Sequence, residues 1–339
     1  LIEGESVSPR DSIDIKGVNT NGSDALGEIA MEIIAGYKTL DDTKYVALVK
    51  ADGNDGGKIF GNTATFSEYI DKSFRLDYGV KKSFYKTLSE LLSAEKKVNN
   101  GSSNNYKDLT SRTLAGVLYL GGDDIMLMMP SVIAVPFAVK MFKEIKSETG
   151  FTFKVGVISV KPDHPVQFAY KAVNELMESS KVTGKSSLSC LVFSSTLASD
   201  GVVESELKKY RRERDTYLVV SNTIESVEGL LKLVGLNDFD NLVSIYKNNE
   251  KNKVRDLIRP LEDLTNYADT HKFYDTLAYI LRSRARSNSG AKSDKRKAYE
   301  SELISYLLKN SFEDSDKEKK IRMPLYDYYF ILKSIRVGV

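Results

Sequence analysis

The stretch LYLGGDDIMLMM (118–129) constrains the fold most, because two apolar runs flank two glycines and two aspartates. Glycine and aspartate are common in tight turns, and short apolar runs suit buried strands. The stretch therefore predicts two antiparallel strands joined by a turn that carries Asp123 and Asp124 side by side. One interpretation is an acidic turn without chemistry, and the other is a turn that holds metal ions.

The apolar periodicity around this hairpin predicts the order β-α-β-β-α-β, followed by one more helix and strand. Gly150 is the expected stop of the helix that follows the hairpin. This order indicates a ferredoxin-like α+β unit with additions. The predicted strands and helices are 45–51 (strand), 81–98 (helix), 112–120 and 125–130 (the two hairpin strands), 131–149 (helix), 151–160 (strand), 165–182 (helix) and 187–195 (strand).

The length of 339 residues is sufficient for two domains. Residues 1–42 are predicted to be a polar lead-in with one helix, which Asp24 caps. Residues 43–222 form the mixed domain. Strand signals stop after it, and six amphipathic stretches predict an all-α domain at 223–339.

Composition excludes several classes of protein. The net charge of +2 means that any nucleic-acid contact must come from local patches, such as the basic stretch 282–297. That stretch is either an RNA contact or a solvated connector. The single cysteine, Cys190, excludes a disulfide scaffold and favours the cytoplasm. No run is long enough to span a membrane, no secretory signal opens the chain, and Leu1 in place of Met suggests a fragment of a longer protein.

In a β-α-β-β-α-β unit the first and third strands are neighbours. The end of the first strand, at Asp52, is therefore expected to lie beside the turn that holds Asp123 and Asp124. Three close carboxylates repel one another, and a divalent cation removes that repulsion. Carboxylate oxygens suit Mg²⁺ or Mn²⁺, and two such ions can activate a hydroxyl and neutralise a leaving pyrophosphate. The predicted metal and catalytic site comprises Asp52, Asp123 and Asp124, with Gly53 as a further metal contact.

The glycines beside these aspartates suggest a nucleotide site. The loop GNDGG (53–57) can aim successive backbone N–H groups at a triphosphate, and the glycine pair of the hairpin lets a nucleotide approach closely. The nucleotide contacts predicted from these two segments are Asn54, Asp55, Gly56, Gly57, Gly121 and Gly122.

These motifs resemble a known family. LVKADGNDGGKIFG, LYLGGDDIMLMMP and FKVGVISVKPDHPVQFAYKAVNELMESSKVTGKS are similar to the palm domain of the large polymerase/cyclase-like subunit of type III CRISPR effector complexes, nearest to the Cmr-type branch. More distantly, they resemble GGDEF diguanylate cyclases and class III nucleotidyl cyclases. The chain would be the C-terminal half of that subunit, a GGDD palm plus a helical domain.

The resemblance implies a function. Members of the family convert ATP into 3′–5′ cyclic oligoadenylate with two Mg²⁺ or Mn²⁺ ions when their complex binds target RNA. The implied partners are ATP, other subunits of the ribonucleoprotein complex, and guide and target RNA through that complex. The resemblance assigns the first-strand ligand to Asp52 and the GGDD ligands to Asp123 and Asp124.

Three further residues follow from the same resemblance. Lys181 and Lys185 match a helix end and loop where related cyclases contact the triphosphate, although both could equally be solvated surface lysines. Ser67 matches a serine that touches ribose or phosphate, and a helix-capping serine is the alternative. The family often has Asp-x-Asp where this chain reads Asp52-Gly53-Asn54, so the resemblance supports binding of the second ion less strongly than binding of the first. Asp55 is the candidate replacement for the missing carboxylate.

Two other functions remain open. The palm could be a catalytically weak scaffold whose helical domain binds RNA and partner subunits. It could also be a diguanylate-type cyclase, although GGDD in place of GGDEF argues against that. ATP turnover separates the first alternative from synthesis, and preference for GTP would indicate the second.

Overall fold

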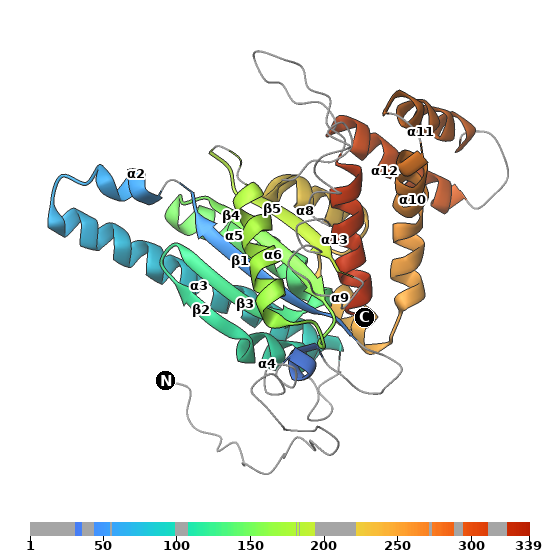
Figure 1. The fold of residues 1–339 in the computed structure, drawn as a ribbon. Helices are drawn as coiled ribbons and strands as arrows, with labels where there is room; N and C mark the ends of the chain where they lie inside the picture. The colour runs from blue at the N-terminus through green and yellow to red at the C-terminus, as the bar shows by residue number, and fades with distance from the viewer. Residues whose placement is uncertain are drawn as a thin grey trace, which may run out of the picture.

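The computed structural model describes residues 31–35, 44–54, 56–98, 108–180, 182, 184–193, 222–270, 273–287, 294–310 and 324–339. A six-stranded mixed sheet lies at the centre, in the order β2-β3-β1-β4-β5-β6 (Figure 1). The order β2-β3-β1-β4 with antiparallel neighbours is that of a ferredoxin-like unit, as predicted. The strands are β1 (Val46–Gly53), β2 (Val117–Gly121), β3 (Asp124–Pro130), β4 (Phe153–Val160), β5 (Ser187–Val192) and β6 (Asn222–Thr223).

Helices cover both faces of this sheet. Helices α3 (Phe66–Val98) and α5 (Ser131–Thr149) pack on one face, and α6 (Val166–Ser179) packs on the other (Figure 1). Gly150 ends α5 in the left-handed conformation, with φ of 75°, and its N–H donates to the Lys146 carbonyl, so the predicted stop is confirmed. Helix α3 begins fifteen residues before the predicted start at 81, because its first half lies outside the buried core.

A buried carboxylate sets the position of the hairpin. Glu95 of α3 accepts the backbone N–H groups of Leu109 and Thr110 at the start of α4 (Asp108–Ala115), at 2.8 and 3.1 Å. Burial raises the pKa of Glu95, while these hydrogen bonds act in the opposite direction. The backbone of Gly116, directly after α4, leaves no room for a side chain against the Met128 carbonyl. Strand β2 follows α4 and pairs with β3 at the outer side of the sheet. The prediction of a strand from residue 112 is therefore wrong for 112–115, which form the end of α4.

The remaining helices follow β6. Helix α13 returns to the sheet and packs against α10, α5 and β5. Its buried large side chains include Tyr328, Ile331 and Leu332. Burial of each such side chain stabilises the fold by about 1.5–3 kcal/mol. The helices after β6 are α8 (Ile224–Leu233), α9 (Phe239–Lys247), α10 (Lys251–Thr270), α11 (Phe273–Ser287), α12 (Asp294–Lys309) and α13 (Leu325–Val337).

A cluster of three buried hydroxyls fastens α13 to the sheet. The Oγ atoms of Ser131 and Ser159 lie 2.6 Å apart, and Ser334 Oγ lies 2.6 Å from that of Ser159. Ser131 also donates to the Ser334 carbonyl at 2.6 Å. All three side chains are fully buried, and because they bond one another, none leaves an unsatisfied polar group in the core.

The predicted boundary at 222–223 falls at β6, which pairs with β5 and leads directly into α8. Division into a mixed domain at 43–222 and an all-α domain at 223–339 stays a prediction, and the packing of α13 on β5 and α5 was not part of it. Of the lead-in helix predicted within 1–42, residues 31–35 are described and are helical.

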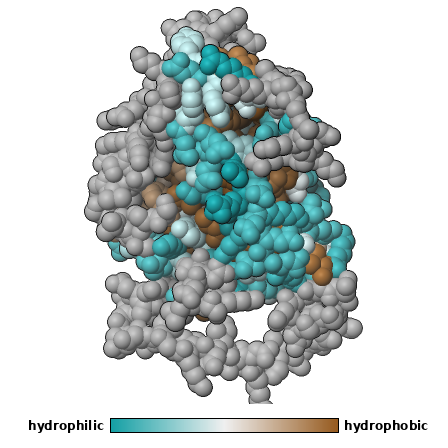
Figure 2. Space-filling model, turned by 90° about the vertical axis from the view of Figure 1, so that its right-hand side faces the viewer, coloured by the Kyte–Doolittle hydropathy of each residue, from teal (hydrophilic) through white to brown (hydrophobic). Residues whose placement is uncertain are grey.

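The face on the side of α10 and α11 is mostly hydrophilic where it is described, with smaller apolar areas (Figure 2). Among the described helices, none is both long and apolar enough to cross a membrane.

Candidate functional site

Two of the predicted aspartates face each other across the centre of the sheet. In the antiparallel register of β1 and β3, Asp52 lies directly opposite Asp124. On its other side, Asp52 lies opposite Lys154 of β4. Directly opposed residues of antiparallel strands point to the same face, so Asp124, Asp52 and Lys154 form a row. Lys154 forms an ion pair with Glu178 of α6, which places the row on the α6 face.

Lys154 neutralises Asp52 in this row. Its ammonium lies 2.9 Å from Asp52 Oδ2 and 2.8 Å from Glu178 of α6, and its side chain is 11% exposed. Burial disfavours the ammonium, but the hydrogen bonds from Glu178 and Asp52 outweigh that cost and raise the pKa of Lys154. The first-strand carboxylate therefore already has a cationic partner, which was not among the residues predicted from the sequence.

The third predicted carboxylate lies toward the opposite face. Asp123 accepts the N–H of Gly53 through its backbone carbonyl at 2.8 Å. A Cβ at Gly53 would lie 2.8 Å from the Asp123 Cβ, and a Cβ at Gly56 would lie 3.1 Å from Asp123 Oδ2. Because side chains alternate along a strand, Gly53 points away from the face that carries Asp52. The carboxylate of Asp123 therefore lies in a cradle made by two glycines.

A further aspartate supports the hairpin turn. Asp77 of α3 accepts the N–H of Gly122 at 3.2 Å and pairs with Lys81 at 2.7 Å. Gly122 has a φ of +58°, a conformation that favours glycine, and a Cβ on Gly121 would lie 3.2 Å from Asp77 Oδ1. The two glycines of the motif thus fit the turn and its contact with α3.

The arrangement only partly meets the expectation of three converging carboxylates. Asp52, Asp123 and Asp124 do meet at one edge of the sheet, but the described residues contain no group of three or more His, Cys, Asp or Glu side chains placed to hold a metal ion. The donor chemistry nevertheless fits a hard divalent cation, since all three side chains offer carboxylate oxygens. The glycine cradle at Asp123 leaves space that any larger residue would fill.

Asn54 has a structural role in addition to the predicted nucleotide contact. Its buried side-chain amide donates to Thr152 Oγ1 at 3.1 Å and to the Lys185 carbonyl at 3.2 Å, while its Oδ1 has no protein partner. Asn54 thus brings Lys185 to the same edge as Asp52, and the Lys185 side chain is exposed there. Lys181 and Asp55 lie outside the described residues.

Two predictions about the segment after β1 require correction. Gly56 and Gly57 do not lie in a loop, because they begin the short helix α2 (Gly56–Gly61). Ser67 is exposed inside α3 and does not cap it, since Thr65 Oγ1 accepts the Glu68 N–H at 3.2 Å and Glu68 accepts the Ala64 N–H at 3.1 Å. Thr65 is therefore the N-cap, and Glu68 bonds the residue before it, which is a variant of the capping box that the sequence TFSE predicts.

A comparison with protein families decides what the sheet represents. Residues 45–189 match the family model of the second palm domain of Cas10/Cmr2. This segment is a palm domain. It contains the whole acidic edge, from Asp52 through the hairpin to Lys185, and the helices after β6 follow it.

Solved structures with the same fold include two of the Csm1–Csm4 cassette. The chain in the complex with AMPPNP has a TM-score of 0.53 and the chain in the complex with cA3 one of 0.52, each at 14% identity. Both comparisons cover 91% of this chain and 38% of the other chain. A Csm1–Csm4 subcomplex of a type III-A CRISPR–Csm interference complex matches at 0.51 and 14% identity. These similarities show the fold, and the Cmr-type assignment stays a prediction.

Among curated proteins, the "Inactive adenylate kinase" of Plasmodium falciparum (isolate 3D7) is 28% identical over 123 residues. The match covers 34% of this chain and 47% of that protein. This short similarity assigns no family to the chain.

The described histidine of the palm and its cysteine are both buried. His164 is buried and stacks on Phe193, and burial lowers its pKa, so the ring is neutral near pH 7. Burial raises the pKa of Cys190 to about 12 and keeps the thiol protonated. His271 lies outside the described residues.

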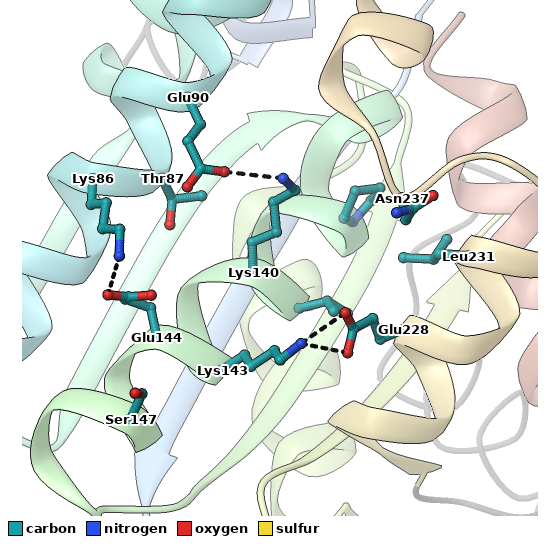
Figure 3. Close-up of a pocket in the computed structure, with 12 residues that line it drawn as sticks. Lys86, Thr87, Glu90, Lys140, Lys143, Glu144, Ser147, Glu228, Leu231 and Asn237 are labelled. Carbon is teal, nitrogen blue, oxygen red and sulfur yellow. Dashed lines mark hydrogen bonds and ion pairs between the residues drawn. The ribbon is translucent and has the colours of Figure 1, made fainter.

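A cleft of about 350 Å³ lies away from the acidic edge, between α3, α5 and α8 (Figure 3). Its charged side chains are paired across the helices, as the dashed lines for Lys86–Glu144, Lys140–Glu90 and Lys143–Glu228 show. Exposed pairs of this kind stabilise a protein by about 0–1 kcal/mol each. The cleft therefore joins three helices and lacks the acidic, glycine-lined character of the edge.

Proposed function

We propose that this palm binds ATP and, with divalent cations, joins adenylate units into cyclic oligoadenylate within a type III CRISPR ribonucleoprotein of the cytoplasm. The observation that carries the proposal is the register that sets Asp52 opposite Asp124, with Asp123 bonded to Gly53, inside a segment matching the Cas10/Cmr2 second palm. The structural neighbours crystallised with AMPPNP and with cA3 support it by their shared fold.

The proposed Mg²⁺ or Mn²⁺ ligands are Asp52, Asp123 and Asp124, with the backbone of Gly53 as a further oxygen donor. Bound ions would lower the pKa of an attacking 3′-hydroxyl and stabilise charge on the α-phosphate. The protein itself contributes by holding the carboxylates in position. The β1–β3 ladder fixes Asp52 and Asp124, and Asp77 fixes the turn from α3.

The proposed nucleotide contacts surround these carboxylates. Gly121 lies against Asp77 of α3 and Gly122 takes the left-handed conformation of the turn. Gly56 and Gly57 begin α2, with Gly56 beside Asp123. Lys185 stands exposed at the same edge and offers a point charge to a phosphate. Asn54, Asp55, Ser67 and Lys181 complete the set, with Asn54 acting through the position that it gives to Lys185.

The ion pair between Lys154 and Asp52 favours a second candidate function. A palm whose first-strand carboxylate is held by a lysine could be catalytically weak and serve as a scaffold that binds RNA and partner subunits. Incubation of the chain, alone and within its complex with target RNA, with Mn²⁺ and each NTP in turn separates the two. A cyclic adenylate product identified by mass supports synthesis. Normal assembly without consumption of any NTP supports the scaffold, and a guanylate product would indicate a diguanylate-type cyclase.

A further inference from the structure

The charge of Lys154 competes with any cation that binds Asp52, because Lys154 already forms an ion pair with that carboxylate. It reaches Asp52 from β4 while Asp124 flanks Asp52 from β3, so one carboxylate lies between a cation and a second carboxylate. An ammonium and a divalent cation would both be attracted to Asp52, and they repel each other at short range. Occupation of Asp52 by one therefore opposes occupation by the other.

Glu178 offers Lys154 an alternative partner. Both of its carboxylate oxygens lie 2.8 Å from Lys154 Nζ, and Glu178 lies outside the β1–β3 edge, on α6. Lys154 can therefore release Asp52 without becoming a partly buried, unpaired cation, a state that would be costly. Release needs only a small side-chain movement, because the ammonium already touches both partners.

The packing of α6 keeps this alternative partner within reach. A Cβ on Gly156, two residues after Lys154 on the same face of β4, would lie 2.7 Å from the Val173 carbonyl and 2.9 Å from the Met177 N. The helix backbone therefore touches the strand beside Lys154. This contact fixes the start of β4 against the end of α6, where Glu178 is located.

We propose that Lys154 is a positioning residue that holds Asp52 until a divalent cation binds, and that Glu178 then retains Lys154 so that Asp52 can turn to the cation. The proposal rests on the proposed function for the assignment of Asp52 as a metal ligand. In the proposal Asp52 binds either Lys154 or the divalent cation. Glu178 stays paired with Lys154 in both states.

Two variants that break this triad are expected to shift Mn²⁺ affinity in opposite directions. The measurement is a titration of the full chain with Mn²⁺, in which electron paramagnetic resonance counts free ions. Lys154→Met removes the competing charge, so binding should tighten by about tenfold. Glu178→Gln leaves Lys154 with Asp52 as its main partner, so binding should weaken by about three- to tenfold.

Matched variants control for fold and for general electrostatics. Lys82→Met removes a lysine of the pair Lys82–Glu148, which joins α3 to α5, and should leave Mn²⁺ affinity unchanged. Lys154→Gln keeps a polar side chain at the site should the methionine fail to fold, and should also tighten binding. Asp52→Asn identifies the part of the binding that depends on Asp52, and circular dichroism verifies the fold of each variant.

Unchanged or weaker Mn²⁺ binding in both Lys154 variants would overturn the proposal, as would a shift in the same direction for Glu178→Gln. Absence of any Asp52-dependent Mn²⁺ binding in the unmodified chain would also overturn it. Failure of the proposed function has a different signature. If Mn²⁺ affinity responds as expected and the assembled complex consumes no ATP, the inference stands and synthesis does not.

Discussion

The two ends of β1 differ in how their polar groups are satisfied. At the start of the strand, Ser131, Ser159 and Ser334 lie fully buried and bond one another. At its end, the Asp52 side chain is 36% exposed, lies opposite Asp124 and forms an ion pair with Lys154. Hydroxyls can donate and accept among themselves, so a neutral cluster can be sealed in a core. Ionised carboxylates only accept, and therefore need water or a cation.

The two ends of β1 are therefore expected to serve stability and chemistry separately. The sealed end, which carries the cluster of Ser131, Ser159 and Ser334, joins α13 to the sheet and is expected to determine whether the palm folds. The open end, which carries Asp52, is held by hydrogen bonds to backbone and by glycine contacts, and its carboxylates contribute little to the core. Variants at the first end should change stability, and variants at the second should change cation binding and turnover.

Truncation after residue 236 should have the largest effect, because it removes α13 and its buried side chains from β5 and α5. We expect the truncated palm to lose its cooperative thermal transition in circular dichroism. The single substitution Ile331→Ala, which leaves α13 in place, should cost about 2–5 kcal/mol of unfolding free energy. A truncated chain that melts at the temperature of the full chain would show that the sealed end does not support the palm.

The double variant Asp123→Ala/Asp124→Ala should abolish product while the fold remains. Both side chains are exposed, so their removal leaves the core intact and relieves repulsion from Asp52. We expect the yield of cyclic adenylate, measured by mass, to fall by at least about a hundredfold. Asp163→Ala, in an exposed turn of the same palm, is the control. An unaltered yield in the double variant would remove the metal-site assignment.

Asp52→Asn should lower activity at least as much as either single hairpin variant, because Asp52 is the charged residue that ends β1. The Mn²⁺ concentration for half-maximal turnover should rise by about tenfold or more, since hard cations depend on ligand charge. Asp55→Asn, measured in the same titration, is the comparison. A crippled Asp55→Asn beside a nearly normal Asp52→Asn would transfer the ligand role to Asp55.

Ser334→Ala should act only on the sealed end. It removes one hydroxyl from a buried cluster of three and leaves the others with fewer partners, which costs about 1–3 kcal/mol of unfolding free energy. Urea denaturation measures this loss. Mn²⁺ affinity should be unchanged, and a shift in that affinity without a loss of stability would contradict the separation of the two ends.

His164 should give the smallest effect, a dependence of stability on pH. Burial lowers the pKa of His164 below its ordinary value of 6.5, so the unfolded chain takes up a proton first as the pH falls. Its contribution is therefore complete above about pH 6.5 and is lost as the pH falls through the lowered pKa. Between pH 7.5 and pH 5, His164→Phe should show a shallower decline in unfolding free energy than the unmodified chain. Equal slopes would mean that His164 is not the group responsible.

The sequence alone predicted the hairpin, the stop at Gly150 and the order β1, α3, β2, β3, α5, β4, α6 and β5, because each depends on local periodicity or on a single residue's conformational freedom. The short helices α2 and α4 were not predicted. The ferredoxin-like strand order followed from that element order, and with it the proximity of Asp52 to the hairpin turn. The N-cap at Thr65 with Glu68 three residues later could also be predicted from TFSE, whereas the prediction of Ser67 as the cap was wrong.

Only the tertiary structure determined which charged side chains form ion pairs. The partnership of Lys154 with Asp52 depends on the register between β1 and β4, residues more than a hundred positions apart, and a lysine near the start of an apolar strand was the only local sign of it. The separation of Asp123 from Asp124 depends on the pleat, which sends neighbouring side chains to opposite faces. The serine cluster needed three distant segments to pack together. Local patterns are encoded by neighbours in sequence, whereas electrostatic balance and polar satisfaction depend on distances that exist only after the chain has folded.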